Sequence, residues 1–326
     1  MTGAAEGVRA IDHLGYQGCL ALDNGDARVV LGHHAGGRVL EYSTAGQNAL
    51  FVDPAQAGWT WKEGEPAIHI TGGRCDIGPE HVIPRHPTMW LGPWTAEAAG
   101  PRHARLSSQD DAPTGTRLIR DFVLDATGTR LAFTQTIVNV SDKVTEWCHW
   151  SRTFAPHGGI AVVPVTCRPM SRFPRGYVMY EAGASTGKPG IGFRPEDPNI
   201  TRHTAGDYDV LVIRPVPLFP KLGFDSYAGW LAYLEPNGLL FVKRFPTYPD
   251  RVYNEVAAIT SCVYYPAREF VELEPIGPRE TLSPGESASF TEEWSLLSFP
   301  FPASSAEPDV AALVERVRAA LSAWGG

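Results

Sequence analysis

The segment Ile137-Val-Asn-Val-Ser-Asp-Lys-Val-Thr-Glu-Trp-Cys-His149-Trp150 reads as two short strands separated by a polar turn. Far downstream, Phe270-Val-Glu-Leu-Glu274-Pro275 reads as another strand, and a Pro-Gly turn follows at Leu282-Ser-Pro-Gly-Glu286. Successive side chains of a strand point to opposite faces, so residues two apart share a face. These segments therefore predict antiparallel strands, one presenting a histidine and another presenting a pair of carboxylates.

Much of the remaining chain has the same character, with β-branched or aromatic runs interrupted by Gly, Pro, Asn and Asp. The segments Asp125-Ala-Thr-Gly128 and Glu235-Pro-Asn-Gly238 have the composition of hairpin turns. Many strands and few helices favour a sandwich or barrel over a βαβ fold. The clearest expected strands are residues 27–31, 38–42, 116–124, 130–138, 210–213, 229–234, 239–245 and 288–296.

One helical pattern is evident, at the C-terminus. Pro308-Asp309 would begin the helix and Gly325-Gly326 would end it. We expect residues 1–304 to form one β-domain and residues 305–326 to form a helix docked on it. The apolar residues at helical spacing are Val310, Leu313, Val314, Val317, Leu321 and Trp324.

Composition restricts the class of protein. Of the 326 residues, 43% are hydrophobic and 20% are charged, as in ordinary globular domains. A net charge of −8 disfavours a nucleic-acid partner, and no apolar run approaches the roughly 20 residues of a membrane span. The N-terminus lacks the features of a signal peptide, so we expect a cytoplasmic protein. Scattered cysteines favour buried free thiols: Cys19, Cys75, Cys148, Cys167 and Cys262.

The candidate acid–base residues are His149, Glu272 and Glu274. Alternation places His149 on the face of Trp147, so it is either a packing residue or a proton donor. Glu272 and Glu274 share a face of their strand, and repulsion between them should raise one pKa unless a cation intervenes. A general base near neutral pH benefits from such a shift, although an exposed edge strand would give the same pattern.

Residues 71–94 form a Pro/Gly-rich stretch that reads as a functional loop without regular structure. Its carboxylates and histidines could bind a metal, but their spacing matches no strong metal motif, so we predict no metal and no other cofactor. Lys243 shares a strand face with Phe241 and Phe245, as a lysine at a sheet edge or as a ligand of the substrate. The expected substrate-binding residues are Arg74, Asp76, Glu80, His81, His86, Trp90, Trp150, Lys243 and Tyr248.

The order of these motifs resembles that of the aldose 1-epimerase (galactose mutarotase-like) superfamily, over residues 28–297. The resemblance implies an all-β fold, an antiparallel β-supersandwich, here with a C-terminal helix. In such proteins the histidine after an Asn-x-Ser-Asp-Lys turn protonates the sugar ring oxygen, and His149 matches it. The catalytic glutamate precedes a Leu-x-Pro-Gly-Glu turn, so Glu274 matches the base and Glu272 is the reserve. The family's Leu-His-Gly-Gly run is absent, and only Gly72-Gly-Arg74 and Glu80 are similar to that region.

The sequence and the resemblance together predict a carbohydrate isomerase of the epimerase or mutarotase type. His149 and Glu274 should face one another across one sugar-sized cleft. A lyase or glycoside hydrolase on the same fold is an alternative, and so is a sugar-binding protein without turnover. The expected ligand is a sugar or short oligosaccharide, with no nucleic acid and no membrane as partner; the sequence predicts no oligomeric state.

Overall fold

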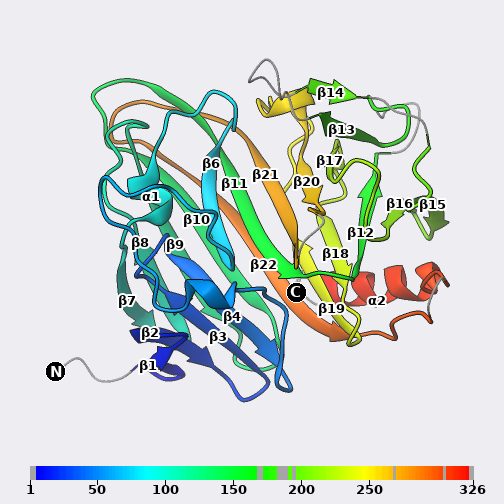
Figure 1. Cartoon of the computed structure of the whole chain (residues 1–326), viewed down its shortest axis with the longest axis horizontal. Coiled ribbons are helices and arrows are strands. Elements are labelled where there is room, and N and C mark those ends of the chain that lie inside the picture. The colour runs from blue at the N-terminus through cyan, green and yellow to red at the C-terminus, as the bar shows by residue number, and fades with distance from the viewer. Residues whose placement is uncertain are drawn as a thin grey trace.

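The computed structural model describes residues 5–166, 172–181, 190–192, 196–266, 269–303 and 306–322. Within these ranges the chain forms two large sheets, and every pairing between their strands is antiparallel. Figure 1 shows β11 and β21 as long neighbouring strands through the middle of the molecule. Cys167, Trp324 and Gly325-Gly326 lie outside the described residues.

The first sheet, sheet A, has twelve strands among the described residues. In spatial order these are β1 (Val8–His13), β2 (Tyr16–Asp23), β3 (Ala27–Gly32), β4 (Arg38–Thr44), β6 (Gly73–Gly78), β11 (Thr145–Pro156), β21 (Phe270–Leu282), β20 (Ser261–Tyr264), β17 (Lys221–Phe224), β13 (Tyr177–Glu181) and β14 (Gly190–Gly192), with β5 (Gln47–Asn48) on β4.

The second sheet, sheet B, has ten strands in the same part of the chain. In spatial order these are β15 (Ile200–Ala205), β16 (Tyr208–Ile213), β12 (Ile160–Val165), β18 (Trp230–Leu234), β19 (Leu239–Arg244), β22 (Ser287–Ser298), β10 (Leu131–Asn139), β9 (Thr116–Leu124), β8 (His103–Ser107) and β7 (Thr95–Gly100). Two 3-10 turns, η1 (Pro54–Gln56) and η2 (Val256–Ala258), lie in connections.

The strands form where the sequence alternates. In β9 and β10 nearly every second residue is buried, and the predicted hairpin turns join β9 to β10 and β18 to β19. The eight expected strands are confirmed as β3, β4, β9, β10, β16, β18, β19 and β22, with small differences at their ends. The four described cysteines are buried and free, as expected.

Residues 71–94 contain more regular structure than expected. Gly73–Gly78 is the strand β6, which pairs with β11, and Pro87–Leu91 is the short helix α1. The prediction of an irregular loop is therefore wrong for these two segments. Arg, Cys and Asp are poor strand formers, but β6 lies between β4 and β11, and neighbouring strands satisfy its backbone.

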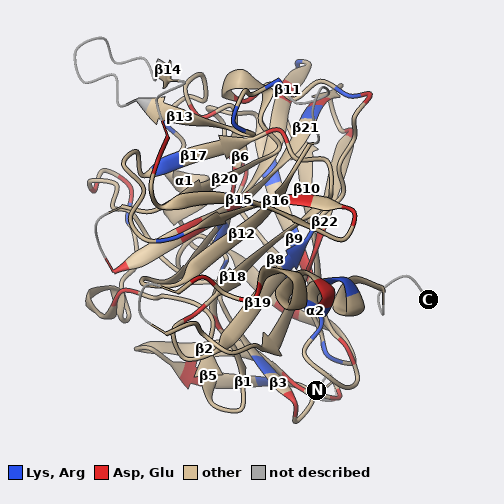
Figure 2. Ribbon diagram, turned by 90° about the vertical axis from the view of Figure 1, so that its right-hand side faces the viewer, with Lys and Arg blue, Asp and Glu red and all other residues tan. Residues whose placement is uncertain are grey.

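The C-terminal helix α2 (Val310–Ser322) packs on sheet B. Asp309 caps it, since the Asp309 carboxylate accepts a hydrogen bond from the backbone N–H of Ala312 at 3.0 Å. Leu313 and Val317 are fully buried against residues of β12, β16, β18 and β19. Figure 2, which looks toward this side, shows basic and acidic residues interspersed over the strands and α2. No helix among the described residues is long and apolar enough to cross a membrane.

The main hydrophobic core lies between the sheets and takes alternate residues from each central strand. Cys75 and Ile77 of β6 and Leu273 of β21 point inward, to the core that β9, β10 and β22 also line. We call this the inner face of sheet A. Residues between them point to the outer face, which is also largely buried, because the cluster around Trp150, Phe173 and Ile259 covers part of it.

Candidate functional site

Three neighbouring strands bring charged residues together on the outer face of sheet A. Strand β6 contributes Arg74 and Asp76, opposite Arg152 and Trp150 of β11 in the register of the pair. Strand β21, on the other side of β11, contributes Glu272 and Glu274. With Glu80 and Lys221 these residues form what we call the outer-face cluster: Arg74, Asp76, Glu80, Trp150, Arg152, Lys221, Glu272 and Glu274.

Glu272 and Glu274 are the central pair of the cluster. They share a strand face as expected, are 2% and 1% exposed, and influence each other's ionisation. Burial, and then the neighbouring Glu274 carboxylate, raise the pKa of Glu272 well above its usual range. Burial opposes ionisation of Glu274 too, but Lys221 and Arg152 hold its pKa below the usual value. The two pKa values therefore shift in opposite directions, and Glu272 is the more readily protonated of the pair.

Trp150, Arg152 and Lys221 surround the ionised carboxylate. The indole N–H of Trp150 donates to Oε2 of Glu274 at 2.8 Å. The guanidinium of Arg152 lies 4.6 Å and the ammonium of Lys221 5.4 Å from the centre of the Trp150 ring system. Glu80 accepts from both cations, at 2.7 Å from Arg152 and 2.8 Å from Lys221, which holds the pKa of Glu80 low despite burial.

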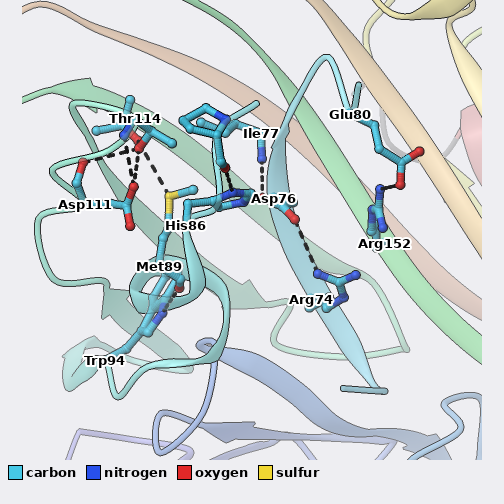
Figure 3. A network of polar contacts seen from close by, with 12 residues as sticks. Arg74, Asp76, Ile77, Glu80, His86, Met89, Trp94, Asp111, Thr114 and Arg152 are labelled. Atoms are coloured by element: carbon cyan, nitrogen blue, oxygen red, sulfur yellow. Dashed lines mark hydrogen bonds and ion pairs between the residues drawn. The ribbon is translucent and has the colours of Figure 1, made fainter. Parts of the chain in front are cut away.

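Asp76 links a histidine to an arginine at the other end of the cluster (Figure 3). One oxygen of Asp76 lies 2.7 Å from Nε2 of His86, and the other lies 3.4 Å from Nη1 of Arg74. Nδ1 of His86 is 2.7 Å from the carbonyl oxygen of Pro84, so both ring nitrogens face acceptors. Burial opposes protonation, but Asp76 raises the pKa of His86. These contacts favour the protonated form of His86. The guanidinium of Arg74 lies 4.8 Å from the centre of the Trp90 ring.

His69 lies at the exposed margin of the cluster. Its Nε2 is 3.4 Å from Oε1 of Glu272, while 46% of its side chain is exposed. Partial burial, together with Arg74 and Arg152, lowers the pKa of His69 to about 4, so the ring is neutral near pH 7. Glu80, with 44% of its side chain exposed, is the other exposed residue of the group.

His149 is on the opposite face from the one that catalysis requires. It shares a face with Trp147, as expected, but that face points inward. The ring of His149 is 1% exposed, stacks on Phe290 of sheet B at 5.6 Å and donates from Nε2 to the carbonyl oxygen of Ala288 at 3.2 Å. Burial lowers its pKa to about 4. The expectation that His149 and Glu274 face one another across a cleft is wrong.

Two expected ligands are also elsewhere. Lys243 is fully buried between the sheets, where it pairs with Glu292 of β22, so it cannot reach a ligand on the outer face. Tyr248 lies in a separate surface groove beside Arg244, Ser289 and Glu293, which shares no residue with the outer-face cluster. Strand alternation relates Lys243 correctly to Phe241 and Phe245, but those rings point to the core.

His81 lies beside the cluster, with Nδ1 3.9 Å from a carboxylate oxygen of Glu255. Glu255 in turn accepts a hydrogen bond from the backbone N–H of Glu80 at 2.9 Å. Within the described ranges, no three His, Cys, Asp or Glu side chains converge to hold a metal ion.

Sequence reasoning missed three members of this site: Arg152, Lys221 and His69. Alternation from Trp150 would have placed Arg152 beside it on the outer face. Lys221 and His69 have no such signal, because they reach the cluster only through the packing of β17 and of the segment before β6.

Comparison with known proteins supports the fold. No protein-family model matches this sequence, and no curated protein matches it. Among solved structures, a galactose mutarotase-like protein from Lactobacillus casei superposes with a TM-score of 0.58 at 10% identity, covering 86% of this chain and 100% of that one. A protein from Escherichia coli assigned by inference as an aldose 1-epimerase gives 0.55 at 12% identity, covering 86% and 98%.

A third structure, the Slr1438 protein from Synechocystis, gives a TM-score of 0.55 at 14% identity and covers 92% of this chain and 99% of that one. At these identities the likeness is one of fold. The chain has an antiparallel β-supersandwich like that of galactose mutarotase-like proteins, which confirms the predicted fold class.

Proposed function

We propose that the protein is a carbohydrate isomerase of the mutarotase type in which Glu274 is the base and Glu272 is the acid. The observation that supports this most is the buried pair of carboxyl groups, whose pKa values shift in opposite directions. The fold, shared with proteins described as mutarotase-like, supports a sugar as the ligand. His149, the acid expected from sequence, has no place in this mechanism because it lies between the sheets.

The proton balance of ring opening suits this pair. The Glu274 carboxylate takes the proton from the anomeric hydroxyl, and the electrons of that O–H bond form the C1 carbonyl. The bond between C1 and the ring oxygen breaks, and the ring oxygen receives the proton of Glu272. The pair then still holds one proton, now on Glu274, and ring closure on the other face of C1 reverses both transfers. Each positioned group contributes about 10²–10⁴-fold to the rate.

The charges of the outer-face cluster support an uncharged sugar. Arg74, Arg152 and Lys221 face the carboxylates of Asp76, Glu80 and Glu274. The cluster is thus balanced without an ionic ligand, and its arginine and lysine N–H groups remain donors for sugar hydroxyls. The anomeric end would enter between His69 and Glu80, the exposed members.

Hydrolysis of a glycoside fits this geometry less well. A retaining hydrolase needs its two carboxyl groups about 5 Å apart, and an inverting enzyme needs a wider gap that admits water. The strong mutual effect of Glu272 and Glu274 on their pKa values favours carboxyl groups closer together than either arrangement requires.

The test is anomer exchange measured by magnetisation-transfer NMR or polarimetry on a panel of aldoses and their uronate and phosphate derivatives. We expect wild-type protein to accelerate exchange of at least one uncharged aldose more than its charged derivatives. Glu272→Gln and Glu274→Gln should each lower kcat/KM by about 10²-fold or more. Glu280→Gln, on the same strand and paired with Arg251 outside the cluster, is the matched control and should leave kcat/KM unchanged. Saturable sugar binding without any acceleration would replace this proposal with a binding protein.

A further inference from the structure

A second group of buried charges lies directly behind the outer-face cluster, between the sheets. Nζ of Lys243 on β19 is 3.2 Å from Oε2 of Glu292 on β22, and both side chains are fully buried. Gln135 and Trp294 donate to the two oxygens of Glu292 at 3.1 and 3.0 Å. Removing two charges from water is costly, and their attraction need not repay that cost, so a stable core does not require this pair.

Lys243 reaches across the core to the two strands of the site. Nζ donates to Oγ1 of Thr153 at 2.9 Å, to the carbonyl oxygen of Leu273 at 3.0 Å and to Oγ of Ser151 at 3.3 Å. Thr153 and Leu273 are direct partners in the register of β11 and β21. One ammonium group thus ties both members of a cross-strand pair.

These three contacts lie behind the residues of the outer-face cluster. Leu273 is the residue between Glu272 and Glu274, and Ser151 and Thr153 are the two neighbours of Arg152. Since side chains alternate between faces, Lys243 holds the inner side of the backbone segments whose outer side chains meet in the site.

The register of β11 against β21 requires such support, because it changes just beside the site. Between the pairs Cys148–Arg279 and Trp150–Ile276, β21 has one residue more than β11. A β-bulge of this kind locally disrupts the ladder. In a strand with two different faces, a slip of one residue would exchange inward and outward side chains and remove both glutamates from the outer face.

We propose that Lys243 is a positioning residue that, from the interior, fixes the register of β11 and β21 and so holds Glu272 and Glu274 beside Arg152 and Trp150. The expected effect of Lys243 on turnover rests on the proposed function. Its expected effect on the geometry of the carboxyl pair is independent of that function.

The test removes the interior pair as a unit, in the variant Lys243→Met with Glu292→Gln. Removing both charges keeps the net charge of the core at zero but also removes the attraction between Lys243 and Glu274, so the geometric effect is read from a variant that keeps both charges. Leu313→Ala is the matched control, because Leu313 is fully buried between α2 and sheet B and contacts neither site strand. A milder variant, Thr153→Val, removes one acceptor of Lys243 at nearly constant volume.

The readout is the titration of the two carboxyl groups by carbon-13 NMR of glutamate-labelled protein, assigned with Glu272→Gln and Glu274→Gln. We expect the two carboxyl groups of wild type to titrate at different pH values, because their pKa values shift in opposite directions. In the double variant the separation between the two pKa values should narrow by about one pH unit or more. Thr153→Val should narrow it in the same direction by a smaller amount, and Leu313→Ala should not change it. If the protein is an isomerase, kcat should also fall about tenfold or more in the double variant, with a displaced pH profile.

Unchanged carboxyl titration in both Thr153→Val and the double variant would overturn the proposal and leave Lys243 a purely structural residue. If the double variant does not fold, the carboxyl titration of Thr153→Val alone decides whether Lys243 is a positioning residue or a purely structural one. Absence of isomerase activity in wild type would remove the proposed function but would leave the titration result standing, so the two failures are distinguishable.

Discussion

Glu272 and Glu274 lie two residues apart on β21, and their surroundings shift the pKa values of the two carboxyl groups in opposite directions. Glu272 has an ionised carboxylate as its neighbour, whereas Glu274 has Lys221, Arg152 and the indole N–H of Trp150. A carboxylate can act as a base only while it is ionised, and a carboxyl group can act as an acid only while it is protonated. The proposed reaction therefore depends on the difference between the two environments more than on either residue type.

This difference predicts the pH dependence of kcat/KM. The lowered pKa of Glu274 keeps the base ionised to below the usual glutamate range, so activity should persist there. The pKa of Glu272 is raised well above that range, and activity should decline only as Glu272 loses its proton on the alkaline side. The profile is measured over the pH range in which the circular dichroism spectrum is constant. A pH profile with a single inflection near the usual pKa of histidine would contradict the assignment of Glu274 as base and Glu272 as acid. It would indicate that an imidazole is the group that titrates.

At the same scale, His149 predicts acid sensitivity of the fold. Its folded-state pKa is about 4, against 6.5 in the unfolded chain. Between these values the unfolded chain binds the proton and the folded protein does not, so stability is complete above pH 6.5 and is lost as pH falls toward 4. The loss from this residue is about 3 kcal/mol.

His149→Leu should remove that contribution, so its free energy of unfolding should fall less steeply from pH 6.5 to 4 than that of wild type. Urea unfolding at several pH values measures the difference in slope. His103→Leu, at the sheet surface beside Asp121, is the control. Parallel curves for wild type and His149→Leu would show that the buried ring does not resist protonation.

At the scale of elements, β6 illustrates why sequence reasoning misjudged part of the site. Its residues Gly73–Gly78 have low strand propensity, and Pro79 follows directly, so the local pattern indicates a loop. Pairing with β11 decides otherwise, and that pairing places Arg74 and Asp76 opposite Arg152 and Trp150. Propensity describes a segment alone, whereas a central strand is stabilised by neighbours that are distant in sequence.

The helix α2 behaves as an element that stabilises without contributing to chemistry. Leu313→Ala should lower the free energy of unfolding by about 2–5 kcal/mol, because it opens a cavity between α2 and sheet B. The site lies on sheet A, so kcat/KM should remain that of wild type. Denaturant titration and the anomer-exchange assay measure the two quantities. A fall in activity at full folding would show that α2 is coupled to the site.

At the scale of the molecule, alternation and turn composition were sufficient to predict the all-β class, two hairpins and the positions of ten of the 22 described strands. They also related His149 to Trp147 and Glu272 to Glu274 correctly. A period of two does not reveal which of two faces points to the core, and this is why His149 and Lys243 were assigned to the wrong side. Lys221 joins the site through the strand order β11-β21-β20-β17, which no local pattern encodes.

The alternation of roles along β6, β11 and β21 makes this sheet suitable for redesign. Inward residues such as Ile77 and Leu273 hold the two layers together, while the outward residues between them are free to specify chemistry. A library that exchanges Arg74, Arg152 and Glu274 as one set, with the inward residues kept, would alter reactivity and leave the layer packing intact. Because different residues carry the packing and the chemistry, proteins that evolve from this one can acquire new substrates through few substitutions. None of the intermediate variants then has to lose its fold.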